Sequence, residues 1–262
     1  NSQEQENRMN KLNIIILLII YSQISFAQSE NNYIETGDSF YKKFDLKNAA
    51  LNYQKAYDKK PNDYYSLQKL TRVYNDLGEY YYEIKDNKNA ETSINNALKY
   101  AEIFQSKFPD SASVYSLLAL SYGNIALFKG DKEKIKLAYK IKDNAEKAIK
   151  LNPNDFLPYI ILSIYNRQIA SLSWLERTFA NLFFGKVPEG SFVDAEKLML
   201  KALSIQPDVV IAMFHLSLVY QETDEEEKEI TWLKKVIDAP INDFRDQFAK
   251  AKAKKRLAEL LD

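Results

Sequence analysis

Side chains suited to acid–base or metal chemistry are scarce in this chain. Its 262 residues include one histidine, His215, and no cysteine. Thiolate and imidazole groups supply most nucleophiles, general bases and structural zinc ligands, so this composition argues against a catalytic triad, a histidine or thiolate metal cluster and a disulfide framework. His215 follows Phe214 on an apolar segment, which favours a partly buried structural role over a functional one. We therefore expect no catalytic residues, no metal and no cofactor.

Two clusters of like charge are the remaining candidates for ion or surface binding. Glu225, Glu226 and Glu227 fall in a predicted turn, where solvated carboxylates are the usual case and a bound cation is the alternative. The basic residues between Lys250 and Arg256 favour the charged face of a terminal helix over contact with anionic lipid or an acidic partner. Because 36 basic residues balance 36 acidic ones, nucleic acid is not an expected partner.

A repeated pattern of small and aromatic residues must position these side chains. Its clearest copy is Ala49-x3-Tyr53-x2-Ala56-x4-Pro61, which places two small residues and one ring on a single helical face and then stops the helix at proline. Gly37 and the aromatic residues around it form the preceding helix of the same unit. Four further units follow, closing at Pro109, Pro153, Pro207 and Pro240.

This pattern resembles the tetratricopeptide (TPR) repeat, W-x2-L-G-x2-Y…A-x3-F…P. The resemblance implies an all-α, right-handed superhelical TPR-like α-solenoid of about five helix pairs, with the first helix of each pair lining a concave face. The fourth unit departs from the array. Large apolar residues from Trp174 to Phe183 recur there at helical spacing, which predicts an inserted amphipathic helix at about residues 169–185.

The sequence is predicted to divide into three segments. Residues 1–27 combine an upstream extension with a secretory signal peptide, in which Lys11 precedes the apolar run Ile14–Tyr21 and cleavage falls near Ala27/Gln28. The apolar run is short for a span, so a retained membrane anchor is the less favoured alternative. Residues 28–242 form the solenoid and 243–262 a C-terminal capping helix. We expect a periplasmic or secreted protein with no stable membrane span after cleavage.

The inserted segment carries a second resemblance. From Leu182, through the Gly185-x2-Pro188-x-Gly190-Ser191 turn, into the helix at Ala195 and on to the C-terminus, the chain is similar to the C-terminal domain of the regulator of microtubule dynamics family. The resemblance implies links to microtubules, membrane contacts and phospholipid binding, with organelle-targeting segments in eukaryotic members. An exported chain carrying a bacterial-type signal is not expected to meet microtubules.

The register of the repeats assigns two sets of residues to the concave face. One set is mixed and polar and forms a candidate groove for a peptide: Tyr41, Tyr65, Gln68, Arg72, Asn75, Asn124 and Arg167. The other is apolar and forms a candidate pocket in the last two units: Leu157, Ile160, Ile164, Ile211, Phe214 and Leu218.

These two sets support two interpretations of function. We predict a non-enzymatic protein–protein interaction scaffold that binds a peptide or protein segment in its concave groove. The alternative is a carrier of lipid or another apolar small molecule, with Arg167 or Arg72 near its head group and a cavity beneath the 169–185 helix. The apolar set would equally serve as core if the inserted helix covered it, since burial of such side chains stabilises the fold in either case.

Overall fold

The computed structural model describes residues 32–129, 131–184 and 186–261. Within these ranges the chain forms α-helices and their connections and no strand, so the prediction of an all-α protein is confirmed. None of the helices described is long and apolar enough to cross a membrane. The predicted signal peptide lies outside the described residues.

The chain divides into two compact units, residues 1–66 and 67–262. In the first, a helix at residues 32–42 pairs with α2 (Leu46–Lys59). Gly37 permits the close approach, because a Cβ added there would lie 2.4 Å from the Tyr53 ring. The Tyr53 hydroxyl donates a hydrogen bond of 2.6 Å to Asp38. The first repeat is therefore held by contacts that its own spacing predicts.

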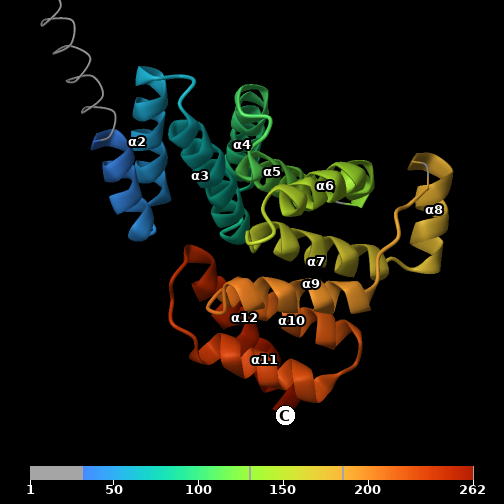
Figure 1. Ribbon diagram of the computed structural model, residues 1–262. Helices are drawn as coiled ribbons and strands as arrows, with labels where there is room; N and C mark the ends of the chain where they lie inside the picture. Colours follow the sequence, from blue (N-terminus) through green and yellow to red (C-terminus); the bar gives the residue numbers. More distant parts are fainter. Residues whose placement is uncertain (1–31, 130, 185, 262) are drawn as a thin grey trace, which may run out of the picture. The chain divides into compact units, whose positions relative to one another are not determined.

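The second unit contains the remaining helix pairs (Figure 1). Helix α3 begins at the end of the first unit and runs into the second. The helices are α3 (Tyr64–Glu83), α4 (Asn87–Lys107), α5 (Ala112–Lys129), α6 (Asp131–Leu151), α7 (Leu157–Ala170), α8 (Trp174–Phe184), α9 (Phe192–Ile205), α10 (Val210–Glu222), α11 (Glu226–Asp238) and α12 (Phe244–Leu261). The pairs are α3 with α4, α5 with α6, α7 with α9, and α10 with α11, and α12 follows the last pair.

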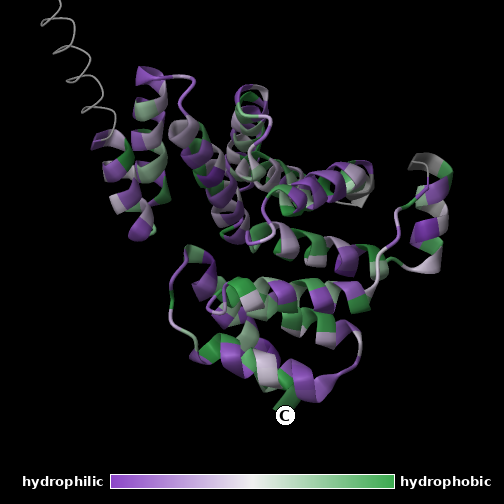
Figure 2. Ribbon diagram, viewed as in Figure 1, coloured by the Kyte–Doolittle hydropathy of each residue, from purple (hydrophilic) through white to green (hydrophobic). Residues whose placement is uncertain are grey.

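Small residues on the second helix of each pair explain how closely the helices pack. Ala90, Ala97, Ala145, Ala148 and Ala195 have no exposed surface. Helices with alanine at the contact approach closely, and larger side chains from the neighbouring helices fill the remaining space. Figure 2 shows many hydrophobic residues along α7, α9 and α10, and these helices are neighbours in the stack. The predicted α-solenoid of stacked helix pairs is thus confirmed.

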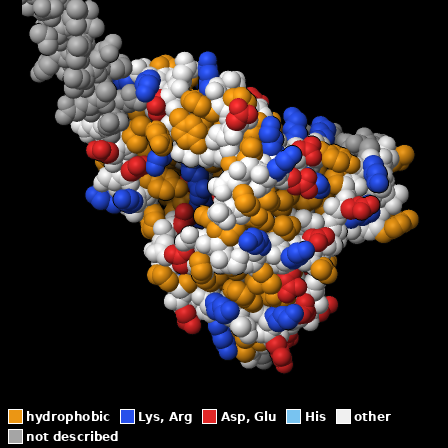
Figure 3. Space-filling view, viewed as in Figure 1, with side chains coloured by type: hydrophobic (Ala, Val, Ile, Leu, Met, Phe, Trp, Pro, Cys, Tyr) orange, Lys and Arg blue, Asp and Glu red, His pale blue; other side chains and the backbone are white. Residues whose placement is uncertain are grey.

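The inserted helix α8 lies between the two members of the fourth pair. Ala180 packs into the core formed by α5, α6 and α7. Trp174, Leu175 and Leu182 instead point to solvent, with exposed fractions of 78%, 69% and 77%. Figure 3 shows hydrophobic side chains at the right edge of the view, in the place of α8 in Figure 1, with acidic and basic side chains nearby. The insert therefore adds an apolar outer surface and buries one small face.

The chain returns from α8 through a tight contact at Gly190. A Cβ added to Gly190 would lie 2.8 Å from Cβ of Ile169 and 2.9 Å from the carbonyl oxygen of Asn166. Neither atom belongs to the flexible end of a side chain, so an added methyl group can be accommodated only if the backbone moves. Ser191 then begins α9, because its hydroxyl accepts a 3.0 Å hydrogen bond from the Asp194 N–H.

We expect Gly190→Ala to lower the free energy of unfolding by about 1–3 kcal/mol, as overpacking of a tight contact does. The matched control is Gly123→Ala in the middle of α5, where an added Cβ would meet no atom within 4 Å. That control should keep or increase stability because alanine favours a helix interior. Urea unfolding of the three proteins checks this, and equal stability of the two variants would contradict it.

Candidate functional site

A cavity of about 560 Å³ lies within the second unit, among α3, α5, α7, α10 and α12. Its floor is apolar. Five of the six residues predicted for an apolar pocket line it: Leu157, Ile160, Ile164, Ile211 and Phe214. The sixth, Leu218, packs on the core shared by α10, α11 and α12. Most of the residues that helical periodicity predicted for the apolar pocket therefore line one cavity.

Helix α12 covers this cavity. Phe244, Phe248 and Lys252 from its first turns line the wall, whereas no described residue of α8 does so. Ala249 and Ala253 hold α12 against the α10–α11 core. The cavity therefore lies beneath the C-terminal helix, and the sequence-based hypothesis of a cavity beneath the inserted helix is not what the described residues show.

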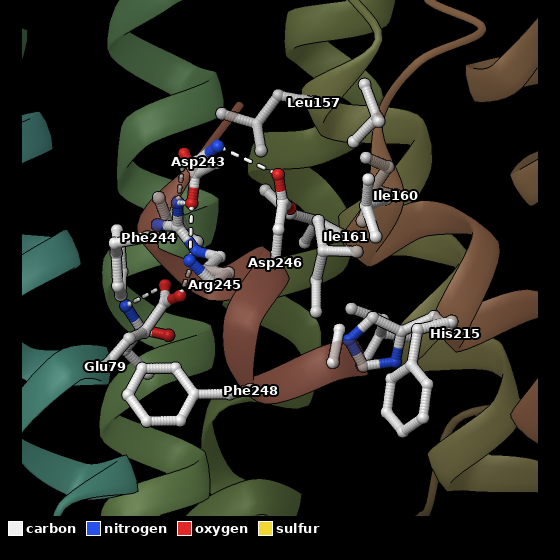
Figure 4. Close-up of a pocket in the computed structure, with 18 of the residues that line it drawn as sticks. Glu79, Leu157, Ile160, Ile161, His215, Asp243, Phe244, Arg245, Asp246 and Phe248 are labelled. Carbon is white, nitrogen blue, oxygen red and sulfur yellow. Dashed lines mark hydrogen bonds and ion pairs between the residues drawn. The ribbon is translucent and has the colours of Figure 1, made fainter. Parts of the chain in front are cut away.

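Arg245 joins α12 to α3 at one side of the cavity (Figure 4). Its guanidinium forms ion pairs with Asp76 and Glu79 of α3 and a 2.9 Å ion pair with Asp243. Asp76 is fully buried and Arg245 is 12% exposed. Burial alone would lower the pKa of Arg245, but the three carboxylates raise it well above the ordinary arginine value. The guanidinium is therefore a permanent cation among carboxylates.

We call the contact between α3 and α12, which includes the ion pairs of Arg245, the α3–α12 seam. Further contacts extend it. Lys252 donates a 2.6 Å hydrogen bond to Glu83. The ring of Tyr80 lies 6.3 Å from the rings of Phe244 and Phe248, both in edge-to-face geometry. On α3 the carboxylates at positions 76, 79 and 83 share one helical face, and the cations at 245 and 252 share a face of α12. Complementary charge therefore brings the two helices together.

Arg167 and His215 are polar groups at another part of the cavity wall. Arg167 is 7% exposed and pairs with Glu222, but its Nε has no hydrogen-bond partner among the described residues. The Nδ1 of His215 is likewise buried without a described partner. Burial, followed by the positive charges of Arg167 and Lys252, lowers the pKa of His215 to about 3. His215 is therefore neutral at physiological pH.

The residues predicted for the polar groove separate into three groups. Arg72, Asn124 and Arg167 line the cavity. Gln68 and Asn75 instead connect α3 to α5, through a 2.6 Å hydrogen bond to Ser113 and a 2.9 Å hydrogen bond to Ser121. Tyr41 and Tyr65 belong to the first unit, where Tyr41 is half-buried and Tyr65 is 61% exposed.

Sequence reasoning did not assign Arg245, Phe248, Asp76 and Glu79 to a site together. The periodicity of each helix shows which of its side chains share a face. It does not show that α3 and α12, far apart in sequence, lie against each other. The matching spacing of acids on α3 and bases on α12 was the available signal, and it becomes informative only once the two helices are paired.

The lining of the cavity is suited to binding a ligand. The cavity combines an apolar floor with charged and amide groups at its edge. This arrangement suits a ligand that has an apolar part and a polar part. Among the residues that the structure describes, no three histidine or acidic side chains converge as metal ligands.

The structure is that of a TPR-like α-solenoid protein. Its helix pairs stack through buried alanines, and its inner helices line one cavity. A thermophilic TPR protein from Thermus thermophilus has this fold, with a TM-score of 0.62 at 17% identity over 88% of this chain and 98% of that one. The resemblance of the sequence to the TPR repeat is thereby confirmed.

The chain belongs to the regulator of microtubule dynamics family, because the profile for regulator of microtubule dynamics protein 1-3 matches residues 33–261. Regulator of microtubule dynamics protein 1 of Bos taurus is 26% identical over 170 residues, covering 64% of this chain and 54% of the relative. Protein 3 of Rattus norvegicus is 28% identical over 175 residues, covering 66% of this chain and 36% of the relative. The matched part is thus about half of the first relative and a third of the second.

Proposed function

We propose that this protein is a non-enzymatic interaction scaffold that takes a segment of a partner protein into the cavity of its second unit. The TPR-like fold and the family support the scaffold class. The observation that carries the proposal is the cavity mouth, where Tyr82 and Leu127 are 41% and 47% exposed and also line the cavity. Large apolar side chains that are exposed at the opening of a cavity are typical of a surface that binds a partner.

The rest of the wall supports the same occupant. A side chain entering past Leu127 would meet Ile161 and Ile164, and burying one large apolar side chain contributes about 1.5–3 kcal/mol. Arg72 and Glu83 at the edge can hydrogen-bond the polar backbone of the same segment. An apolar anchor inside a polar rim is the usual arrangement of energetically important interface residues.

The proposal predicts that Leu127→Arg abolishes partner capture and that Leu151→Arg does not. The two leucines have similar exposed fractions, 47% and 43%, but only Leu127 lines the cavity. A photo-crosslinking residue in place of Tyr82 reports capture in the host cell. We expect a discrete cross-linked product from the parent and the Leu151→Arg protein, and its loss with Leu127→Arg while the urea midpoint is unchanged. A product that survives Leu127→Arg would contradict the proposal.

The same cavity favours a second candidate, a carrier of lipid or another apolar small molecule. Its volume of about 560 Å³ lies within the range of small-molecule sites, and a helix of the same chain covers it. Mass spectrometry of an organic-solvent extract of the purified protein, beside a denatured control, tests this candidate. A stoichiometric lipid would support the carrier, and an empty protein would count against it.

We also propose export by the signal at residues 1–27. The support is the basic start, apolar run and small-x-small site in the sequence. The protein recovered from its host should then begin at or near Gln28, which N-terminal sequencing measures.

A further inference from the structure

Two polar side chains in the wall of the main cavity each have an atom without a hydrogen-bond partner. Arg167 of α7 and His215 of α10 both line the cavity. The Nε of Arg167 and the Nδ1 of His215 are buried, and neither makes a hydrogen bond with any described residue. Buried polar atoms are normally hydrogen-bonded. Two such atoms in one cavity wall therefore indicate a polar group that the cavity takes from outside.

Arg167 and His215 lie close together in this wall. Arg167 pairs with Glu222, the last residue of the helix that carries His215. The pKa of His215 is lowered first by burial and then by the positive charges of Arg167 and Lys252, and all three residues line the cavity. Figure 4 shows the imidazole of His215 directed from its helix toward the other lining residues. We call this part of the wall the Arg167–His215 subsite.

The hydrogen-bonding capacity of the two atoms defines what completes them. An arginine Nε carries one proton and only donates. A neutral imidazole has one nitrogen that donates and one that accepts. We assign His215 the tautomer with its proton on Nε2, the commoner one for a neutral imidazole, so that Nδ1 accepts. The occupant must therefore offer an acceptor to Arg167 and a donor to His215.

The charges around the subsite favour a neutral occupant. Each cation that the structure describes in the cavity wall already pairs with a carboxylate: Arg72 with Asp76, Arg167 with Glu222, Arg245 with Asp76, and Lys252 with Glu83. An incoming carboxylate or phosphate would lose its hydration and lie near these carboxylates without a cation of its own. A cationic group would meet the positive charges that already act on His215.

We propose that the Arg167–His215 subsite binds a carboxamide, the side chain of an asparagine or glutamine in the partner segment. Its carbonyl oxygen accepts from the Nε of Arg167, and its NH₂ group donates to the Nδ1 of His215. A carboxamide is neutral and carries an acceptor and a donor on neighbouring atoms. Its methylene stem suits the apolar floor, which includes Ile164 and Phe214. This inference rests on the proposed scaffold function.

The first test measures charge selectivity with small probes on the full chain. Pentanamide carries the carboxamide on an apolar stem, and pentanoate carries a carboxylate on the same stem. Because His215 is the only histidine, its ring signals in NMR spectra report binding at the subsite. At pH 7 we expect pentanamide to shift these signals and to bind about ten-fold more tightly than pentanoate. Tighter binding of pentanoate, or unmoved His215 signals with pentanamide, would overturn the proposal.

The second test isolates the hydrogen bond to His215. The ketone 2-hexanone keeps the carbonyl oxygen of pentanamide and replaces its NH₂ group with a methyl group. His215→Leu removes the acceptor and keeps a side chain of similar volume. We expect this variant to reduce the preference for pentanamide over 2-hexanone about five-fold, as the loss of one hydrogen bond allows. An unchanged preference would contradict the proposal.

The matched control for His215→Leu is Gln206→Leu. Gln206 also lines the cavity, but its side chain already donates a hydrogen bond to Asp208. The control should therefore keep the parental preference for pentanamide. For the other half of the subsite, Arg167→Lys keeps a cation beside Glu222 and removes the Nε donor. It should weaken pentanamide and 2-hexanone alike, because both present a carbonyl oxygen. Unchanged binding of both probes would count against the role of Arg167.

Cross-linking separates this inference from the scaffold proposal. If His215→Leu reduces the preference for pentanamide but leaves the cross-link from position 82 at its parental yield, the partner presents no carboxamide here. The inference then fails while the scaffold stands. If the cross-link survives Leu127→Arg, the scaffold proposal itself fails. A cross-link that is weakened by His215→Leu, kept with Gln206→Leu and lost with Leu127→Arg supports both.

Discussion

Arg245→Ala will lower the free energy of unfolding by about 3–5 kcal/mol, the usual cost of removing one partner from a buried ion pair. Asp76 is fully buried beside this guanidinium, and Glu79 accepts from the same side chain. Arg72 remains 3.2 Å from Asp76, so Asp76 would keep one of its two cationic partners. Urea unfolding at neutral pH measures the loss.

The control for Arg245 is the other ion pair of the seam. Lys252 is 51% exposed in its pair with Glu83, and exposed pairs contribute little, so Lys252→Met should cost less than about 1 kcal/mol. Adding Asp76→Asn to Arg245→Ala should recover part of the loss, because the buried charge is then gone. A loss from Arg245→Ala as small as that from Lys252→Met would show that the seam does not depend on this residue.

The second large effect is on acid stability and comes from His215. Its pKa is about 3 in the folded protein, against an ordinary value of 6.5. At pH values between these two pKa values, His215 is therefore protonated in the unfolded chain and neutral in the folded chain. The resulting stability is fully present above pH 6.5 and is lost as the pH falls toward 3. Between pH 7 and pH 4.5 the loss from this residue reaches about 2–3 kcal/mol.

Because His215 is the only histidine, its resonance can be followed directly. In the folded protein its imidazole Hε1 signal should not titrate between pH 7 and pH 4.5. Carboxylates also titrate below pH 5, so the stability measurement needs the matched variant His215→Gln, which should lose about 2–3 kcal/mol less than the parent over the same interval. A histidine midpoint near 6.5 in the folded protein would refute the assignment.

The helix pairs could be predicted from the sequence because their determinants are local. Ala49, Tyr53 and Ala56 lie within two helical turns, and their burial follows from helical spacing alone. The same spacing identified Ile160 and Phe214 as inward-facing, and both line the cavity. Residues whose role depends on one helix and its immediate neighbour were therefore within reach of sequence reasoning.

The remaining part of the site depends on the distances between helices of different repeats. The spacing of residues within one repeat does not determine these distances. Asn75 lies on the predicted inner face, yet it bonds Ser121 because α5 approaches α3 closely at that level. From the sequence alone, Arg245 belongs to the charged face of a terminal helix. Its role in the site becomes apparent only from the packing of α12 against α3. A pattern within one repeat gives no information about the angle between successive repeats, and that angle decides which distant helices meet.

The return of α12 to α3 changes how a repeat array of this kind unfolds. In a linear array each repeat contacts only its neighbours, so the terminal repeat can fray while the rest stays folded. Here Arg245 is bonded to residues 166 and 169 positions earlier in the chain. Detaching the last helix therefore also leaves Asp76 and Glu79, in the second helix pair, without the guanidinium of Arg245. Contacts so distant in sequence raise the contact order, so we expect them to slow the final closure during folding and to make α3 through α12 unfold together.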